Sequence, residues 1–158
     1  MQGGGESPTG KQSTTTERVN VEHFDDQVKG LISELSSLHI ALRDAFAELP
    51  ALPIAIPMMA TATLHDATAG MADAVLALRD LPGHPMLTQS LGDAGCQWIC
   101  GVYATLAYTG TGDIGALVAA RFSARVVEQD LSVARMTADG TIPDFLNDPD
   151  GQQGPDKG

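Results

Sequence analysis

Apolar residues between positions 21 and 49 recur at the spacing of an α-helix. Ile32, His39 and Phe46 widen this stripe on one side, which is typical of a helix in a bundle rather than in a two-stranded zipper. Pro50 ends the predicted helix, because proline lacks an amide donor and clashes with the preceding turn. The stripe itself fills two positions of a heptad repeat over four heptads: Val21, Phe24, Val28, Leu31, Leu35, Leu38, Leu42, Ala45 and Leu49.

Three further stretches carry a helical pattern. The second helix is predicted to begin at Pro57, a favoured first helical position, and to end where two prolines and a glycine fall within residues 81–85. The third helix covers residues 87–108. The fourth begins after Asp113, a good N-cap, and ends near Gly140, because glycine often follows the last helical turn.

These patterns predict an all-α fold. Loops of roughly four to seven residues favour antiparallel neighbours, so we expect an antiparallel up-down-up-down four-helix bundle over residues 18–138. Residues 1–17 contain no large apolar side chain after Met1, and we expect a disordered N-terminal segment there. Residues 139–158 are rich in glycine, proline and aspartate and are expected to form a flexible acidic tail.

Composition narrows the class of protein without identifying an activity. The chain has 158 residues, 43% of them hydrophobic and 4% aromatic, so its core must be aliphatic. Twenty acidic and nine basic residues give a net charge of −11, which argues against nucleic acid as a partner, since a phosphate backbone binds clustered lysine and arginine.

The longest uncharged run, between Asp93 and Asp113, is too polar to span a membrane. Without a secretory signal, the expected location is cytoplasmic, with leaderless export left open.

The third helical stretch is hydrophobic nearly all round after Asp93. Such a helix is normally surrounded by protein, whereas every helix of a four-helix monomer keeps one face in water. We therefore expect a non-enzymatic assembly or adaptor protein that binds itself or another protein through this helix. The predicted interaction residues are Cys96, Trp98, Ile99, Cys100, Val102, Tyr103 and Leu106.

A second hypothesis is a pocket for a small ligand, cofactor or metal near Cys96, Trp98 and Cys100, because bundles build such sites from facing helices. Cys96 and Cys100 share a helix face, and His84 could add a third metal ligand, but a closed zinc site needs four. We prefer to interpret the cysteines as two buried thiols that pack as small hydrophobes, so no metal and no cofactor is predicted.

Residues 110–115 match the dinucleotide-binding pattern G-x-G-x-x-G. That pattern requires a preceding strand within a parallel sheet, and the upstream sequence offers no strands, so a turn between helices capped by Asp113 is the preferred interpretation. No Glu-x-x-His, His-Glu-x-x-His or Gly-x-Ser-x-Gly motif is present, so no catalytic site is predicted. His39 is expected to be half-buried in the packing, and His65 and His84 to be exposed.

Arg121, Arg125 and Arg135 lie on one face of the fourth helix. The preferred interpretation is a solvated face. The alternative is a docking site for the acidic tail, whose aspartates at 144, 148 and 150 could pair with these arginines, weakly and in a salt-sensitive way.

Overall fold

The computed structural model describes residues 4, 13–49, 56–59 and 61–141, and the described residues hold helices and no strand. The helices are α1 (Ser13–Glu48), α2 (Leu64–Leu78), α3 (Pro85–Thr111) and α4 (Ile114–Ala138). The predicted all-α fold with four helices is therefore confirmed. Within these residues, none of the helices combines the length and apolarity that a membrane crossing requires.

Capping side chains move two helix starts away from the predicted positions. α2 begins at Leu64 and not at Pro57, because the Thr63 hydroxyl accepts a hydrogen bond from the Asp66 amide (3.1 Å) and donates one to the Asp66 carboxylate (2.6 Å). α3 begins at Pro85, two residues earlier than predicted. The His84 ring nitrogen accepts from the Met86 amide (3.3 Å) and makes His84 the N-cap.

The chain ends agree only partly with the sequence prediction. α1 begins at Ser13, so residues 13–17 are helical although we expected them to be disordered. Once a helix is nucleated, each further residue adds a hydrogen bond, so a helix can extend beyond its apolar stripe. α4 ends at Ala138, followed by Gly140 at a φ of 68°, as the pattern predicted. Residues 1–3, 5–12 and 142–158 lie outside the described residues, and the predictions made for them stay untested.

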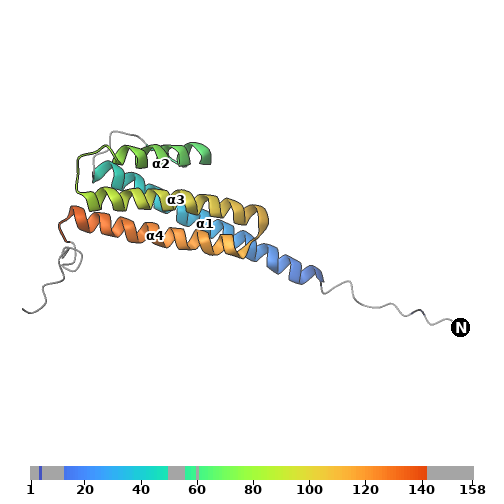
Figure 1. Cartoon of the computed structure of the whole chain (residues 1–158). Coiled ribbons are helices and arrows are strands. Elements are labelled where there is room, and N and C mark those ends of the chain that lie inside the picture. Colours follow the sequence, from blue (N-terminus) through green and yellow to red (C-terminus); the bar gives the residue numbers. More distant parts are fainter. Residues whose placement is uncertain (1–3, 5–12, 50–55, 60, 142–158) are drawn as a thin grey trace, which may run out of the picture.

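α3 and α4 form a tight antiparallel hairpin, the most extensive helix pair of the fold (Figure 1). Gly112 ends α3 at a φ of 68°, in the left-handed region that glycine adopts without strain. The Asp113 carboxylate then accepts from the Gly115 amide (3.1 Å) and starts α4. Residues 112–113 are therefore a turn between the two helices that share the pattern at 110–115, and the interpretation against a dinucleotide loop is confirmed.

The helix directions differ from strict up-down-up-down alternation. α1 runs antiparallel to α3, since Phe24 stacks near Tyr108 while the Nε1 atom of Trp98, ten residues before Tyr108, reaches the carbonyl of Leu35. α2 is also antiparallel to α3, because its C-terminal Leu78 lies at the N-terminal part of α3. α1 and α2 therefore run in the same direction.

The connection over residues 49–63 is long enough to carry the chain back along the bundle, so that α2 can run in the same direction as α1. A helix as long as α2 spans roughly 22 Å, and a fifteen-residue connection can reach about 50 Å when extended. The prediction of alternating directions assumed a short loop, because it began the second helix at Pro57 and so counted residues 57–63 as helix.

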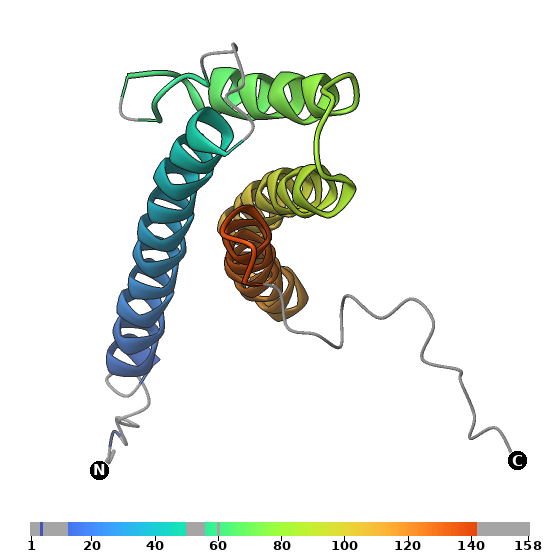
Figure 2. The same cartoon turned by 90° about the vertical axis from the view of Figure 1, so that its left-hand side faces the viewer.

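The core lies between α1 and the hairpin, with α2 covering one end. Figure 2 shows α1 on one side of the α3–α4 pair and α2 lying across the top. The N-terminal part of α1 projects past the turn of the hairpin (Figure 1). The largest fully buried side chains belong to α1, α2, α3 and α4 together: Trp98, Phe46, Leu42, Met71, Leu91, His39 and Val127.

Candidate interaction surface

The structure divides the predicted interaction residues of α3 between the core and the surface. Trp98 is fully buried, its Nε1 donates to the Leu35 carbonyl oxygen (2.9 Å), and its ring lies 4.7 Å from that of His39. Val102 is buried on the same face. The prediction that Trp98 and Val102 contact a partner is therefore corrected: these side chains hold α1 against α3.

The other predicted residues lie at the surface. Cys96, Cys100, Tyr103 and Leu106 are exposed, and Ile99 is half-buried. Their spacing of three or four residues places them away from the buried face of α3. The expectation that α3 presents apolar groups outside the core thus holds for these residues, and Cys96 and Cys100 are not the buried thiols that we preferred.

α4 contributes a row of exposed apolar side chains that the sequence analysis did not assign. Ile114, Val118 and Phe122 follow one another at intervals of four residues, so they form one ridge on the helix surface. The signal was present in the sequence, because none of the three belongs to the core stripe of the fourth helix. We define the hairpin surface as the large apolar residues that are 49–65% exposed in the hairpin: Tyr103, Leu106, Ile114, Val118 and Phe122.

All residues of the hairpin surface except Phe122, which follows Arg121, lie in an almost uncharged part of a strongly charged chain. Residues 94–120 contain one charged residue, Asp113, and its carboxylate caps α4. The other 28 of the 29 charged residues lie elsewhere in the sequence. Large apolar patches with few charges mark contact sites in proteins more often than they mark ordinary solvated surface.

The short length of α2 explains why Leu106 is exposed. Gly92, Ile99 and Leu106 are seven residues apart, so they lie in one row along α3. A Cβ at Gly92 would lie 3.9 Å from Leu78 of α2, and Ile99 is half-buried. α2 has 15 residues and α3 has 27, so the end of the row at Leu106 extends beyond the part of α3 that α2 contacts.

The three arginines of α4 have different surroundings. Arg121 donates a hydrogen bond to the side-chain oxygen of Gln27, and Arg121 and Arg125 line a polar groove of about 640 Å³ between α1 and α4. Asp26 and Glu34 line the same groove. Arg135 is exposed and is not among the lining residues. The aspartates that would dock here lie outside the described residues, so tail docking stays a prediction.

The pocket predicted near the cysteines is only partly present. A cavity of about 260 Å³ between α2 and α3 reaches Cys96, but neither Trp98 nor Cys100 lines it. Partial burial, and then the negative charge of Asp93, raise the pKa of the Cys96 thiol.

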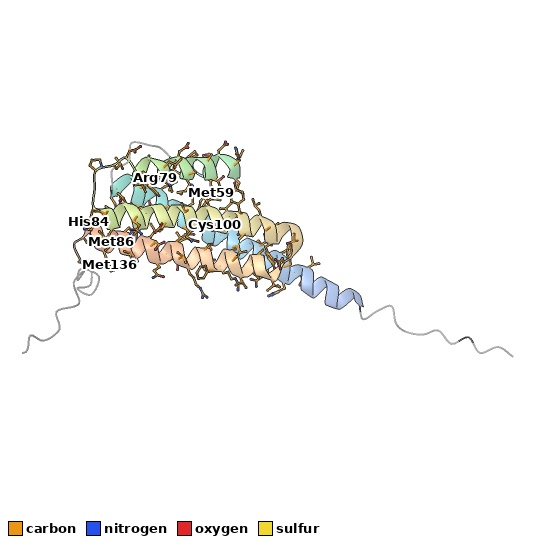
Figure 3. All side chains as sticks on the ribbon, in the orientation of Figure 1. Met59, Arg79, His84, Met86, Cys100 and Met136 are labelled. Carbon is orange, nitrogen blue, oxygen red and sulfur yellow. The ribbon has the colours of Figure 1, made fainter. Side chains whose placement is uncertain are left out.

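His84 and Cys100 are too far apart to share a metal ion. His84 caps α3 at one end of the bundle, while Cys100 lies far along the helix (Figure 3), roughly 24 Å away at the helical rise. Across the described ranges, no three His, Cys, Asp or Glu side chains are grouped as metal ligands.

Comparisons of the chain with protein-family models, with curated proteins and with solved structures found no match.

Proposed function

We propose that the chain is a non-enzymatic assembly protein whose hairpin surface binds a second copy of the chain. The observation that carries this proposal is the exposure of five large apolar side chains in the α3–α4 hairpin, four of them within its nearly uncharged half. Burying each of them would gain roughly 1.5–3 kcal/mol of transfer free energy before the costs of association.

Charge favours this face over the rest of the surface as the contact between copies. Two chains of charge −11 repel each other, and the repulsion is weakest where uncharged segments meet. Such a contact strengthens when salt screens the repulsion, whereas a contact made by ion pairs weakens. An acidic partner would meet the same repulsion.

The two apolar rows lie on different helices, so a row of one copy can bind the other row of a second copy. The ridge formed by Ile114, Val118 and Phe122 of one copy would pack against Tyr103 and Leu106 of the other. Each ridge would occupy the space beside the half of α3 that α2 does not reach, and so complete the bundle there.

Light scattering during size-exclusion chromatography tests this proposal. We expect a dimer at micromolar concentrations that becomes tighter as salt is added, and Phe122→Ser should convert it to a monomer. Leu76→Ser is the matched control, since Leu76 is 53% exposed on α2 and lies outside the hairpin surface. A wild-type monomer throughout this range, or equal loss of dimer in both variants, would overturn the proposal.

The ligand-binding alternative near Cys96 is less well supported, because its cavity is smaller than the roughly 300–1,000 Å³ typical of ligand pockets. Our proposal requires no membrane and assumes the cytoplasm as the compartment.

A further inference from the structure

A second cavity lies on the opposite part of the molecule from the hairpin turn, between the C-terminal half of α1 and the segment 56–59. Its volume is about 300 Å³. Ile32, His39, Ile40 and Arg43 line it from α1, and Met58 and Met59 line it from the segment. Apart from Arg43, no residue that lines it carries a formal charge at neutral pH.

The segment that closes this cavity is held in place from two sides. The Nε atom of Arg43 donates to the carbonyl oxygen of Ile56 (2.8 Å), and the Ile56 side chain is buried in the core. Pro57 lies so close to Gly70 of α2 that a Cβ added at Gly70 would clash with the proline ring. The cavity is therefore part of the packed structure rather than a gap beside a loose loop.

His39 is the feature that the fold alone does not explain. Its side chain is 1% exposed, and its Nε2 atom has no hydrogen-bond partner among the described residues. Burial, followed by the charge of Arg43, lowers the pKa of the imidazole to about 4, so the ring is neutral at neutral pH. Buried polar atoms are nearly always paired in native proteins, because an unpaired one costs free energy that a leucine at the same place would not.

We propose that this cavity binds a small monocarboxylate with an apolar chain. Arg43 supplies the positive charge, and its terminal nitrogens can hold a carboxylate in a paired geometry while Nε stays bound to Ile56. A bound carboxylate would also give the His39 ring a hydrogen-bond partner. Ser36 cannot take that role as a donor, because its hydroxyl already donates to the Ile32 carbonyl oxygen (2.7 Å).

The apolar chain of the ligand would lie between Ile32, Ile40 and the two methionines. Ile32, Ile40 and Met58 are each about half exposed, so a bound chain would cover apolar surface that now faces water. Methionine side chains are flexible and polarisable and adapt to irregular ligands.

Titration of the full chain with octanoate, followed by NMR of the His39 ring nitrogens and the methionine methyls, tests this inference. We expect saturable shifts at His39, Met58 and Met59, and weaker binding of 1-octanol, which has the same chain without the charge. Arg43→Gln should lower the affinity for octanoate by about tenfold or more while changing that for octanol little.

Because Arg43→Gln also removes the bond to Ile56, a second variant keeps the test decisive. Met58→Glu places a carboxylate at the exposed mouth and should weaken octanoate binding without loosening the segment, whereas Leu76→Glu on α2 should not. No saturable shift at His39, equal affinity for octanoate and octanol, or an unchanged affinity in Met58→Glu would each overturn the inference. The monomeric Phe122→Ser variant should still bind octanoate, so this test is independent of the proposed dimer.

Discussion

The indole nitrogen of Trp98 donates a hydrogen bond to the backbone carbonyl oxygen of Leu35, 63 residues earlier in the chain and 2.9 Å away. Both groups are buried, so the bond fixes the position of α1 along α3. The His39 ring, one helical turn after Leu35, lies against the face of the same indole. One aromatic side chain thus determines the register of the first helix and places the histidine of the proposed ligand cavity.

Replacing Trp98 by Phe should destabilise the fold by about 2 kcal/mol or more. The substitution removes this hydrogen bond, worth roughly 0.5–1.5 kcal/mol, and it also leaves unfilled volume in the core. Urea unfolding followed by circular dichroism measures the change. Tyr103→Phe, at an exposed ring on the same helix, should alter the free energy of unfolding by less than about 0.5 kcal/mol. Equal stability of the two variants would contradict this account.

Substituting alanine for two glycines of α3 should change the stability of the fold in opposite directions. A Cβ at Gly101 would lie 3.1 Å from the Leu35 side chain and 3.3 Å from that of Ser123, so Gly101→Ala should cost about 1–3 kcal/mol by overpacking. A Cβ at Gly110 would meet no other group within 4 Å. Gly110→Ala should therefore raise the melting temperature, because alanine favours a helix over glycine by about 0.5–1 kcal/mol. A higher melting temperature in both variants would disprove the close contact at Gly101.

The stability of the fold should fall between pH 6.5 and pH 4 through His39. The pKa of this ring is about 4 in the folded chain and 6.5 in the unfolded chain, so in this window the unfolded chain binds the proton and the folded chain does not. Unfolding becomes more favourable as the pH falls, by up to about 3 kcal/mol. Above pH 6.5 the ring is neutral in both states and contributes no pH dependence.

Urea unfolding of the wild type and of His39→Leu at several pH values isolates this contribution. The free-energy difference between the two proteins should change across the window, while the carboxylates titrate equally in both. A constant difference would show that folding does not lower the pKa of His39.

Cys96 should react slowly for an exposed thiol. Its pKa is raised, first by partial burial and then by Asp93, and only the thiolate is nucleophilic. In a Cys100→Ser background, alkylation of Cys96 by iodoacetamide at pH 8 should be slower than that of an unstructured cysteine peptide. Asp93→Asn should accelerate it, whereas Asp139→Asn, at the end of α4, should not. An unaffected rate in Asp93→Asn would exclude the carboxylate as a cause.

The residues that the sequence predicted correctly are those whose environment depends on one helix alone. The heptad stripe of α1 identified Leu35, Leu38 and Leu42 as core residues, and Asp113 was recognised as a cap from its position after a glycine. The start of α2 was missed because Pro57 and Thr63 are both good start signals, and only the packing of Pro57 against Gly70 separates them.

The surface residues were harder to predict because exposure depends on how far a neighbouring helix extends. Trp98 and Leu106 looked equivalent in an uncharged helix, yet one is buried by α1 and the other lies beyond the end of α2. The cavity beside His39 could not be predicted, since it requires the segment 56–59 to fold back against α1, with Ile56 bound to Arg43 13 residues earlier.

The two-residue turn between α3 and α4 also has a consequence for folding order. Closing so short a loop loses little chain entropy, so the hairpin can form early, while α1 must close a long loop to reach Trp98. We expect substitutions at Ala124 to slow refolding, and substitutions at Leu42 to act mainly by accelerating unfolding, in stopped-flow experiments. During synthesis, α1 is made before the helices that cover it, so its apolar stripe stays uncovered until α3 and α4 have emerged.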